Sequence, residues 1–250
     1  MSGFRTAITF LTRIPIGDGK KPNVEGAPAW FPIVGLLIGA VCGGVFAGGS
    51  WLVGPLPGAA LAIGFGALLT GAFHQDGLAD TADAFGGGWN VEQRLEIFKD
   101  SRHGTYGVMS LVIVTALQIT ALSTLGMRAG FVALVYAHAL GRLGAVVMMR
   151  SLRPVRPDGL ASTLEGSSSY RERLVAGAIV VFLAIGRSNG SGGLILLGAA
   201  TLATVAVGWL SKRKLDGYVG DVLGAAEQVV EVAVLIGAAA LHRHGRTWLY

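Results

Sequence analysis

The chain has 250 residues, of which 52% are hydrophobic and only 14% carry a charge. Soluble domains carry roughly 25% charged residues, and disordered chains combine low hydrophobicity with high charge, so this composition excludes both classes. The single cysteine excludes a disulfide scaffold. The net charge of +5 comes without a basic stripe interleaved with aromatic residues, which argues against nucleic-acid binding. The 39 glycines, which let helices pack closely, fit the remaining class, a polytopic helical membrane protein.

The first predicted element is an amphipathic helix at residues 3–14. Phe4, Ile8 and Leu11 share one face of it, with arginine and threonine side chains opposite. Such a helix is typical of a segment that lies in the membrane interface instead of crossing the bilayer.

Seven apolar runs follow, and a spanning helix needs about 20 such residues. The candidate spans are residues 30–53, 57–73, 106–126, 129–149, 174–187, 191–210 and 220–241. The second and the fifth are short, so the prediction is about seven transmembrane helices, within a range of six to eight. No repeat or change in composition marks a second domain, and we expect one all-α membrane domain over residues 1–250.

Lys and Arg residues are divided unevenly between the two sides of this predicted bundle. Fifteen of the 20 lie in the N-terminal segment and in the loops after the second, fourth and sixth spans, and four lie on the other side. Because cytoplasmic loops carry the excess of Lys and Arg, the first set of loops is predicted to face the cytoplasm.

An acidic run follows the second span at this cytoplasmic boundary. In a helix, Asp76, Asp80 and Asp83 would lie at i, i+4 and i+7 on one face. Three carboxylates this close repel one another unless a cation compensates, and Mg²⁺ takes carboxylate oxygens together with substrate phosphates. A metal site is therefore favoured over the alternative, a solvated acidic face. His74 adjoins the run and would serve either as a base or as a hydrogen-bond partner of a ligating carboxylate.

The segment before the third span combines cations with one acid. Lys99 and Arg102 are suited to hold phosphate oxygens, although a cytoplasmic flank would also contain such cations. Asp100 is either a further metal ligand or the residue that orients Arg102. Two glycines flank Tyr106 and indicate close backbone approach where a helix begins and its free N–H groups favour anions.

Acidic residues also occur in the last span, where buried acids are candidates for function. Asp221 is expected at its cytoplasmic end, level with the aspartate cluster, as a further metal ligand. Glu227 lies one to two turns deeper and is a candidate for substrate binding. Glu231 has an alternative structural role, an ion pair with Arg142 of the fourth span. His138 is most simply a polar contact between helices.

These residues together indicate metal-assisted phosphoryl or nucleotidyl transfer. Carboxylates and nearby cations can position a pyrophosphate and compensate its charge. The sequence contains no P-loop lysine motif and no apparent Ser/His/Asp or Cys/His arrangement for nucleophilic catalysis. Composition and spacing alone lead to a membrane enzyme of phosphate chemistry.

Two runs, DGLADTADAFGG at 76–87 and RLEIFKDSRHGTYGV at 94–108, resemble the signature of the cobalamin synthase family, the adenosylcobinamide-GDP ribazoletransferases. Further matches occur at 10–15 (FLTRIP), 30–40 (WFPIVGLLIGA) and 220–228 (GDVLGAAEQ), so the resemblance covers most of the chain. The family is similar in chemistry to CDP-alcohol phosphotransferases, whose longer acidic pattern is not reproduced here.

The resemblance implies a transfer reaction with Mg²⁺ in the bacterial inner membrane. A ribose hydroxyl of α-ribazole, or of its 5′-phosphate, attacks the cobinamide-linked phosphorus of adenosylcobinamide-GDP, and GMP leaves. On this hypothesis Lys99 and Arg102 neutralise the pyrophosphate or the departing GMP, with Tyr106 and Glu227 also near substrate. His74 or one aspartate takes the alcohol proton. The predicted metal ligands are Asp76, Asp80, Asp83, Asp221 and Asp100.

Two other functions stay open at this point. One is a CDP-alcohol phosphotransferase that makes phospholipid, and the other is a cation-coupled secondary transporter, in which the acids of the last span would bind cations or relay protons. The sequence does not identify a protein partner, whether a second copy of the chain or other late enzymes of cobalamin biosynthesis.

Overall fold

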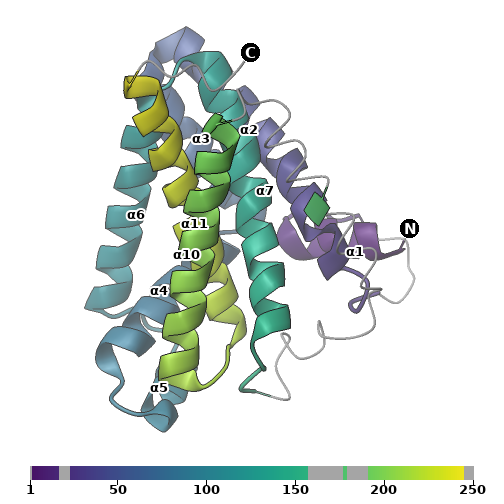
Figure 1. Cartoon of the computed structure of the whole chain (residues 1–250), viewed down its shortest axis with the longest axis vertical. Helices are drawn as coiled ribbons and strands as arrows, with labels where there is room; N and C mark the ends of the chain where they lie inside the picture. The colour runs from purple at the N-terminus through teal and green to yellow at the C-terminus, as the bar shows by residue number, and fades with distance from the viewer. Residues whose placement is uncertain (1, 17–22, 157–176, 179–190, 245–250) are drawn as a thin grey trace.

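A computed structural model describes residues 2–16, 23–156, 177–178 and 191–244 (Figure 1). Every regular element in these ranges is a helix, apart from an isolated β-bridge between Pro154 and Tyr218. The elements are α1 (Ser2–Leu11), the 3-10 helix η1 (Pro28–Trp30), α2 (Phe31–Val53), α3 (Pro55–Thr70), α4 (Phe73–Gly87), α5 (Val91–Ile97), α6 (Thr105–Ser123), α7 (Met127–Ser151), α10 (Ser191–Leu215) and α11 (Gly220–Arg243). The prediction of an all-α protein is confirmed.

Five helices in the described ranges are long and apolar enough to cross a membrane. They are Pro28–Val53, which joins η1 and α2, together with α6, α7, α10 and α11. The bent pair of α3 and α4 would make a sixth span if it crosses as one unit. A multi-span helical membrane protein is therefore confirmed. The predicted span at 174–187 lies almost entirely outside the described residues.

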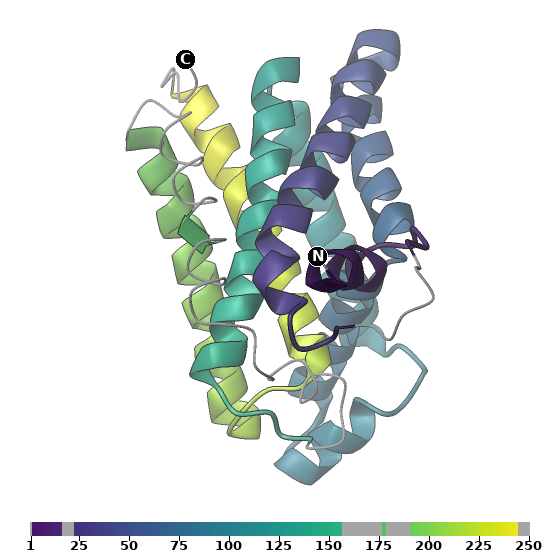
Figure 2. The same cartoon turned by 90° about the vertical axis from the view of Figure 1, so that its right-hand side faces the viewer.

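The N-terminal helix α1 lies across the long helices instead of running along them, as Figure 2 shows. Its buried side is formed by Ala7 and Leu11, and Arg5 is exposed on the other side. Phe10, near the end of α1, stacks on Phe31 of α2 with ring centroids 5.5 Å apart. This arrangement agrees with the amphipathic interfacial helix predicted from the sequence.

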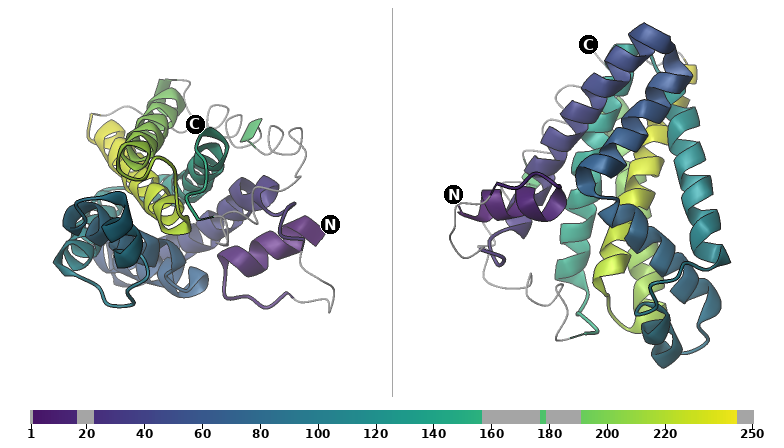
Figure 3. Two further views of the ribbon diagram at one scale, coloured as in Figure 1. Left: turned by 90° about the horizontal axis from the view of Figure 1, so that it is seen from below. Right: turned by 180° about the vertical axis from the view of Figure 1, so that it is seen from behind.

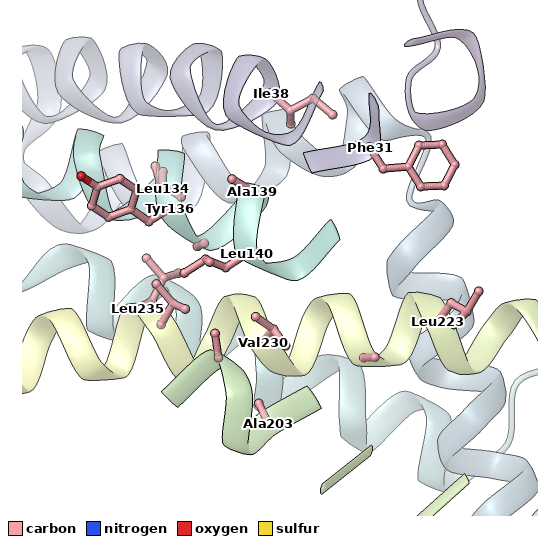
Figure 4. Packing of buried hydrophobic residues seen from close by; sticks show 14 of the residues in the cluster. Phe31, Ile38, Leu134, Tyr136, Ala139, Leu140, Ala203, Leu223, Val230 and Leu235 are labelled. Atoms are coloured by element: carbon pink, nitrogen blue, oxygen red, sulfur yellow. The ribbon is translucent and has the colours of Figure 1, made fainter. Parts of the chain in front are cut away.

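The long helices pack closely because small residues lie where their backbones meet. A methyl group on Gly39 of α2 would lie 2.6 Å from the carbonyl oxygen of Leu134 in α7, so only glycine fits there. The centre of the bundle is the contact between α7 and α11, where Leu140, Val230 and Leu235 are buried (Figure 4). This core fixes the middle of α11 against α7.

A sharp break separates α3 from α4 and places the acidic helix at one end of the bundle. Gly71 and Ala72 both adopt left-handed backbone angles, with φ of 69° and 56°. The two helices meet at 91°, and the backbone N–H of Arg13 donates to the carbonyl of Leu69 at 2.8 Å, which joins α1 to this break. As a result α4, α5 and the start of α11 lie at the same end of the molecule (Figure 1, and Figure 3, right).

Candidate active site

Two aspartates of α4 and a histidine of the loop between α5 and α6 form an acidic cluster, which here means Asp76, Asp80 and His103. One ligand atom of each lies within 4.8 Å of those of the other two. His103 Nε2 is 3.8 Å from Asp76 Oδ1, and its Nδ1 is 3.6 Å from Asp80 Oδ1. The Asp76 and His103 side chains are 61% and 41% exposed, so an ion or a phosphate can reach them from solvent. The predicted helical spacing of the aspartates is confirmed.

The third aspartate of the run has a different environment. Asp83 is buried, and its two oxygens accept hydrogen bonds from the backbone N–H groups of Gly104, at 2.7 Å, and Gly107, at 2.9 Å. These N–H groups belong to the start of α6, where the helix leaves donors unpaired and favours negative charge. The close backbone approach predicted for the two glycines is confirmed, because a methyl group on either would collide with the Asp83 carboxylate. Asp83 thereby fixes the loop that carries His103.

The cations before α6 are exposed at the same end of the molecule. Arg102 donates from Nε to Asp100 Oδ1 at 3.0 Å and from Nη2 to Asp100 Oδ2 at 2.8 Å. The guanidinium holds the pKa of Asp100 at about 2, well below its usual value, through these hydrogen bonds. Asp100 therefore contacts Arg102 through both of its oxygens, which is the contact expected of a residue that orients Arg102. Lys99 is exposed, and Tyr106 is 59% exposed with its ring against Gly86.

Asp221 approaches the acidic helix from the first turn of α11. A methyl group on Gly77 of α4 would lie 2.6 Å from the carbonyl oxygen of Asp221, so the two backbones are in direct contact. Gly77 directly follows Asp76, and Asp221 therefore lies beside the aspartate run, at the height predicted from the sequence.

A cavity of about 280 Å³ opens beside Asp221, between α1, α2, α4, α7 and α11. Its walls are mostly apolar, and its lining includes the side chains of His74, Arg142, Arg156 and Asp221. Arg156 also donates from Nη2 to the carbonyl oxygen of Leu95 at 2.6 Å. The cavity and the acidic cluster thus adjoin one another at the start of α4 and at Asp221.

A buried polar network lies deeper in the bundle. Arg142 forms ion pairs with Glu227 and Glu231, and Glu231 also pairs with His138. Such a cation is required there because an unpaired buried carboxylate is costly. The predicted pair of Glu231 and Arg142 is confirmed. Glu227 pairs with the same arginine and is fully buried. His74 Nδ1 lies 4.0 Å from Glu227 Oε2, so His74 faces this network.

Sequence reasoning assigned no role to two residues that the structure brings to the site. His103 stands in the segment that was singled out, but nothing in its spacing predicts that it meets the aspartates of α4. Arg156 was counted only as a topology signal, and its place on the cavity wall depends on contacts distant in sequence.

A family model described as cobalamin-5-phosphate synthase matches residues 3–239. The chain is 40% identical over 249 residues to an adenosylcobinamide-GDP ribazoletransferase of Bradyrhizobium diazoefficiens, covering 96% of this chain and 94% of the relative. Proteins of the same name from Shewanella frigidimarina and Ralstonia pickettii are 39% and 36% identical and are covered over 90% and 94% of their lengths. No solved structure matches the chain. The chain belongs to the cobalamin-5-phosphate synthase family and is a multi-span membrane transferase of cobalamin biosynthesis.

Proposed function

We propose that the protein joins α-ribazole, or its 5′-phosphate, to adenosylcobinamide-GDP with release of GMP, using Mg²⁺ at the cytoplasmic face of a bacterial inner membrane. The observation that carries this proposal is the acidic cluster at one exposed end of the bundle, with Lys99 and Arg102 in the adjoining loop. The uneven distribution of Lys and Arg supports the orientation, because the described residues Arg94, Arg156 and Lys214 gather around α5 at that end.

The residues of the acidic cluster fit a divalent cation. The Asp76 and Asp80 carboxylates lie one helical turn apart and, among the described residues, share an ion-pair contact only with His103. Hard oxygen donors that are few in number suit Mg²⁺, which keeps several waters and takes the remaining ligands from substrate phosphates. We assign Asp76 and Asp80 as its protein ligands, with Asp221 next to them. Once bound, Mg²⁺ would neutralise the pyrophosphate and the departing phosphate.

The remaining residues would position the reactants. Arg102 presents a guanidinium held by Asp100, and Lys99 adds an exposed positive charge, so the pair would receive the phosphates of the GDP moiety. Asp83 would keep the loop that carries His103 in place through its hydrogen bonds from Gly104 and Gly107. An aspartate of the site or His103 would accept the proton of the attacking ribose hydroxyl. Glu227, with His74 beside it, would hold Arg142 in position at the buried side of the site.

The proposal is tested by measuring GMP release from adenosylcobinamide-GDP by the full chain in lipid nanodiscs. Wild-type protein is expected to release GMP only when α-ribazole and Mg²⁺ are both present. Asp80→Asn should lower the rate at least about 100-fold. It removes one of the two carboxylates that hold the metal, and the metal neutralises the charge of the reacting phosphates. Glu92→Gln, which removes an exposed acid of α5 at the same end, should retain the wild-type rate. Full activity of Asp80→Asn would contradict the assignment.

A further inference from the structure

We propose that the cavity between α1, α2, α4, α7 and α11 is the binding site of the nucleoside acceptor. The flat base would lie among phenylalanine rings and the ribose would point to Asp221. This inference rests on the proposed function and adds where each substrate binds: the acceptor in the cavity, and the pyrophosphate of the donor at the acidic cluster.

Three phenylalanines form an aromatic wall of the cavity. Phe10 stacks on Phe31 with centroids 5.5 Å apart and an interplanar angle of 10°, and it meets Phe73 edge to face at 5.4 Å. The three rings come from α1, α2 and α4, so the interfacial helix completes the wall. Aromatic faces arranged in this way bind flat aromatic ligands by stacking and edge contacts. Phe31 and Leu223, which both line the cavity, lie at the same end of the core in Figure 4.

The size and polarity of the cavity distinguish between the two substrates. A volume of about 280 Å³ holds a bicyclic base with part of its sugar, but it is far too small for a corrin macrocycle. α-Ribazole carries a dimethylbenzimidazole, whose dimethyl-substituted edge is apolar and whose ring has a single free acceptor nitrogen. Guanine instead has donors and acceptors along its edge, and these would be left without partners against Phe10, Leu11, Phe31 and Met149. The walls therefore favour the base of the acceptor over the base of the GDP moiety.

The polar atoms of the cavity are placed to receive the sugar. Arg142 lines it, and its Nε is buried without a hydrogen-bond partner among the described residues. Glu227 and Glu231 hold that guanidinium in position. Asp221 lines the cavity and contacts Gly77 of α4 through its backbone, so a hydroxyl directed at Asp221 emerges beside Asp76. Arg156 supplies a second positive charge, which would receive the phosphate of the phosphorylated acceptor.

Binding of α-ribazole to the purified full chain in nanodiscs, without Mg²⁺ and without the cobinamide substrate, tests the assignment directly. We expect Phe73→Leu and Phe10→Leu, each of which keeps an apolar side chain but removes a ring, to raise the dissociation constant about 3- to 10-fold. Phe65→Leu, which changes an exposed phenylalanine of α3 outside the cavity, should leave it unchanged. GMP should not displace α-ribazole. Unchanged binding in both cavity variants, displacement by GMP, or no binding to the wild-type protein would overturn the proposal.

Steady-state kinetics separate this inference from the proposed function. We expect the cavity variants to raise KM for α-ribazole and to leave KM for adenosylcobinamide-GDP unchanged. If the wild-type protein releases GMP but the variants change only KM for adenosylcobinamide-GDP, the cavity assignment fails and the function stands. If the wild-type protein releases no GMP with both substrates and Mg²⁺, the proposed function fails regardless of the variants.

Discussion

Replacing Asp83 with asparagine separates its anchoring role from the chemistry of the neighbouring aspartates. The carboxylate accepts two backbone hydrogen bonds, from Gly104 at 2.7 Å and Gly107 at 2.9 Å, at the positive start of α6. An asparagine keeps one acceptor and turns an NH₂ group toward the other N–H. One charge-assisted hydrogen bond is lost and a buried donor is left without a partner, which together cost about 2–3 kcal/mol.

The assay is thermal unfolding of the purified protein in one fixed detergent, followed by circular dichroism. For a chain of this size, we expect the apparent Tm of Asp83→Asn to fall by about 5–10 °C. Asp80→Asn is the matched control, because Asp80 lies one turn away and its nearest described ion-pair partner is His103 at 3.6 Å. That variant should keep the wild-type Tm while losing activity. A wild-type Tm for Asp83→Asn would refute the anchoring role.

Two further predictions concern the arginines. Arg142→Gln leaves Glu227 and Glu231 buried without their cation, and we expect a loss of about 3–5 kcal/mol in unfolding free energy. Denaturant unfolding in mixed micelles measures this loss, and the exposed control Arg150→Gln should change little. Equal stability of the two variants would contradict the ion-pair network. Because the pKa of Asp100 is lowered to about 2, its pair with Arg102 is present above the ordinary aspartate pKa and is lost only as the pH falls toward 2. Asp100→Asn should therefore raise KM for adenosylcobinamide-GDP without changing the pH–rate profile between about pH 5 and 9, and a profile that shifts in this range would refute that reasoning.

The sequence alone predicts the parts of the site that depend on short-range spacing. Asp76 and Asp80 lie one turn apart in any helix, and the glycines around Tyr106 indicate a tight helix start, so both features could be derived locally. The charge scarcity of the chain likewise identifies the helical membrane class, because spanning helices exclude charges.

Contacts between residues distant in sequence could not be derived in this way. The partner of Asp83 depends on how the loop before α6 folds back, and the position of His103 follows from the same loop. Glu227 lies 85 residues from Arg142, and either Glu227 or Glu231 has the spacing to meet it, whereas the structure shows that both do. The break at Gly71 and Ala72 was missed because the apolar run continues to residue 73 in the sequence.

The central claim is that a divalent cation bound by the acidic cluster supports transfer from adenosylcobinamide-GDP. The most direct measurement is the rate of GMP release as a function of Mg²⁺ concentration, for wild-type protein and Asp76→Asn, in metal-stripped nanodiscs with both substrates saturating. We expect no release without added metal, and a half-saturating Mg²⁺ concentration at least about 10-fold higher for Asp76→Asn, since losing a carboxylate ligand weakens the site. Metal-independent release, or the same Mg²⁺ dependence in both proteins, would contradict the account.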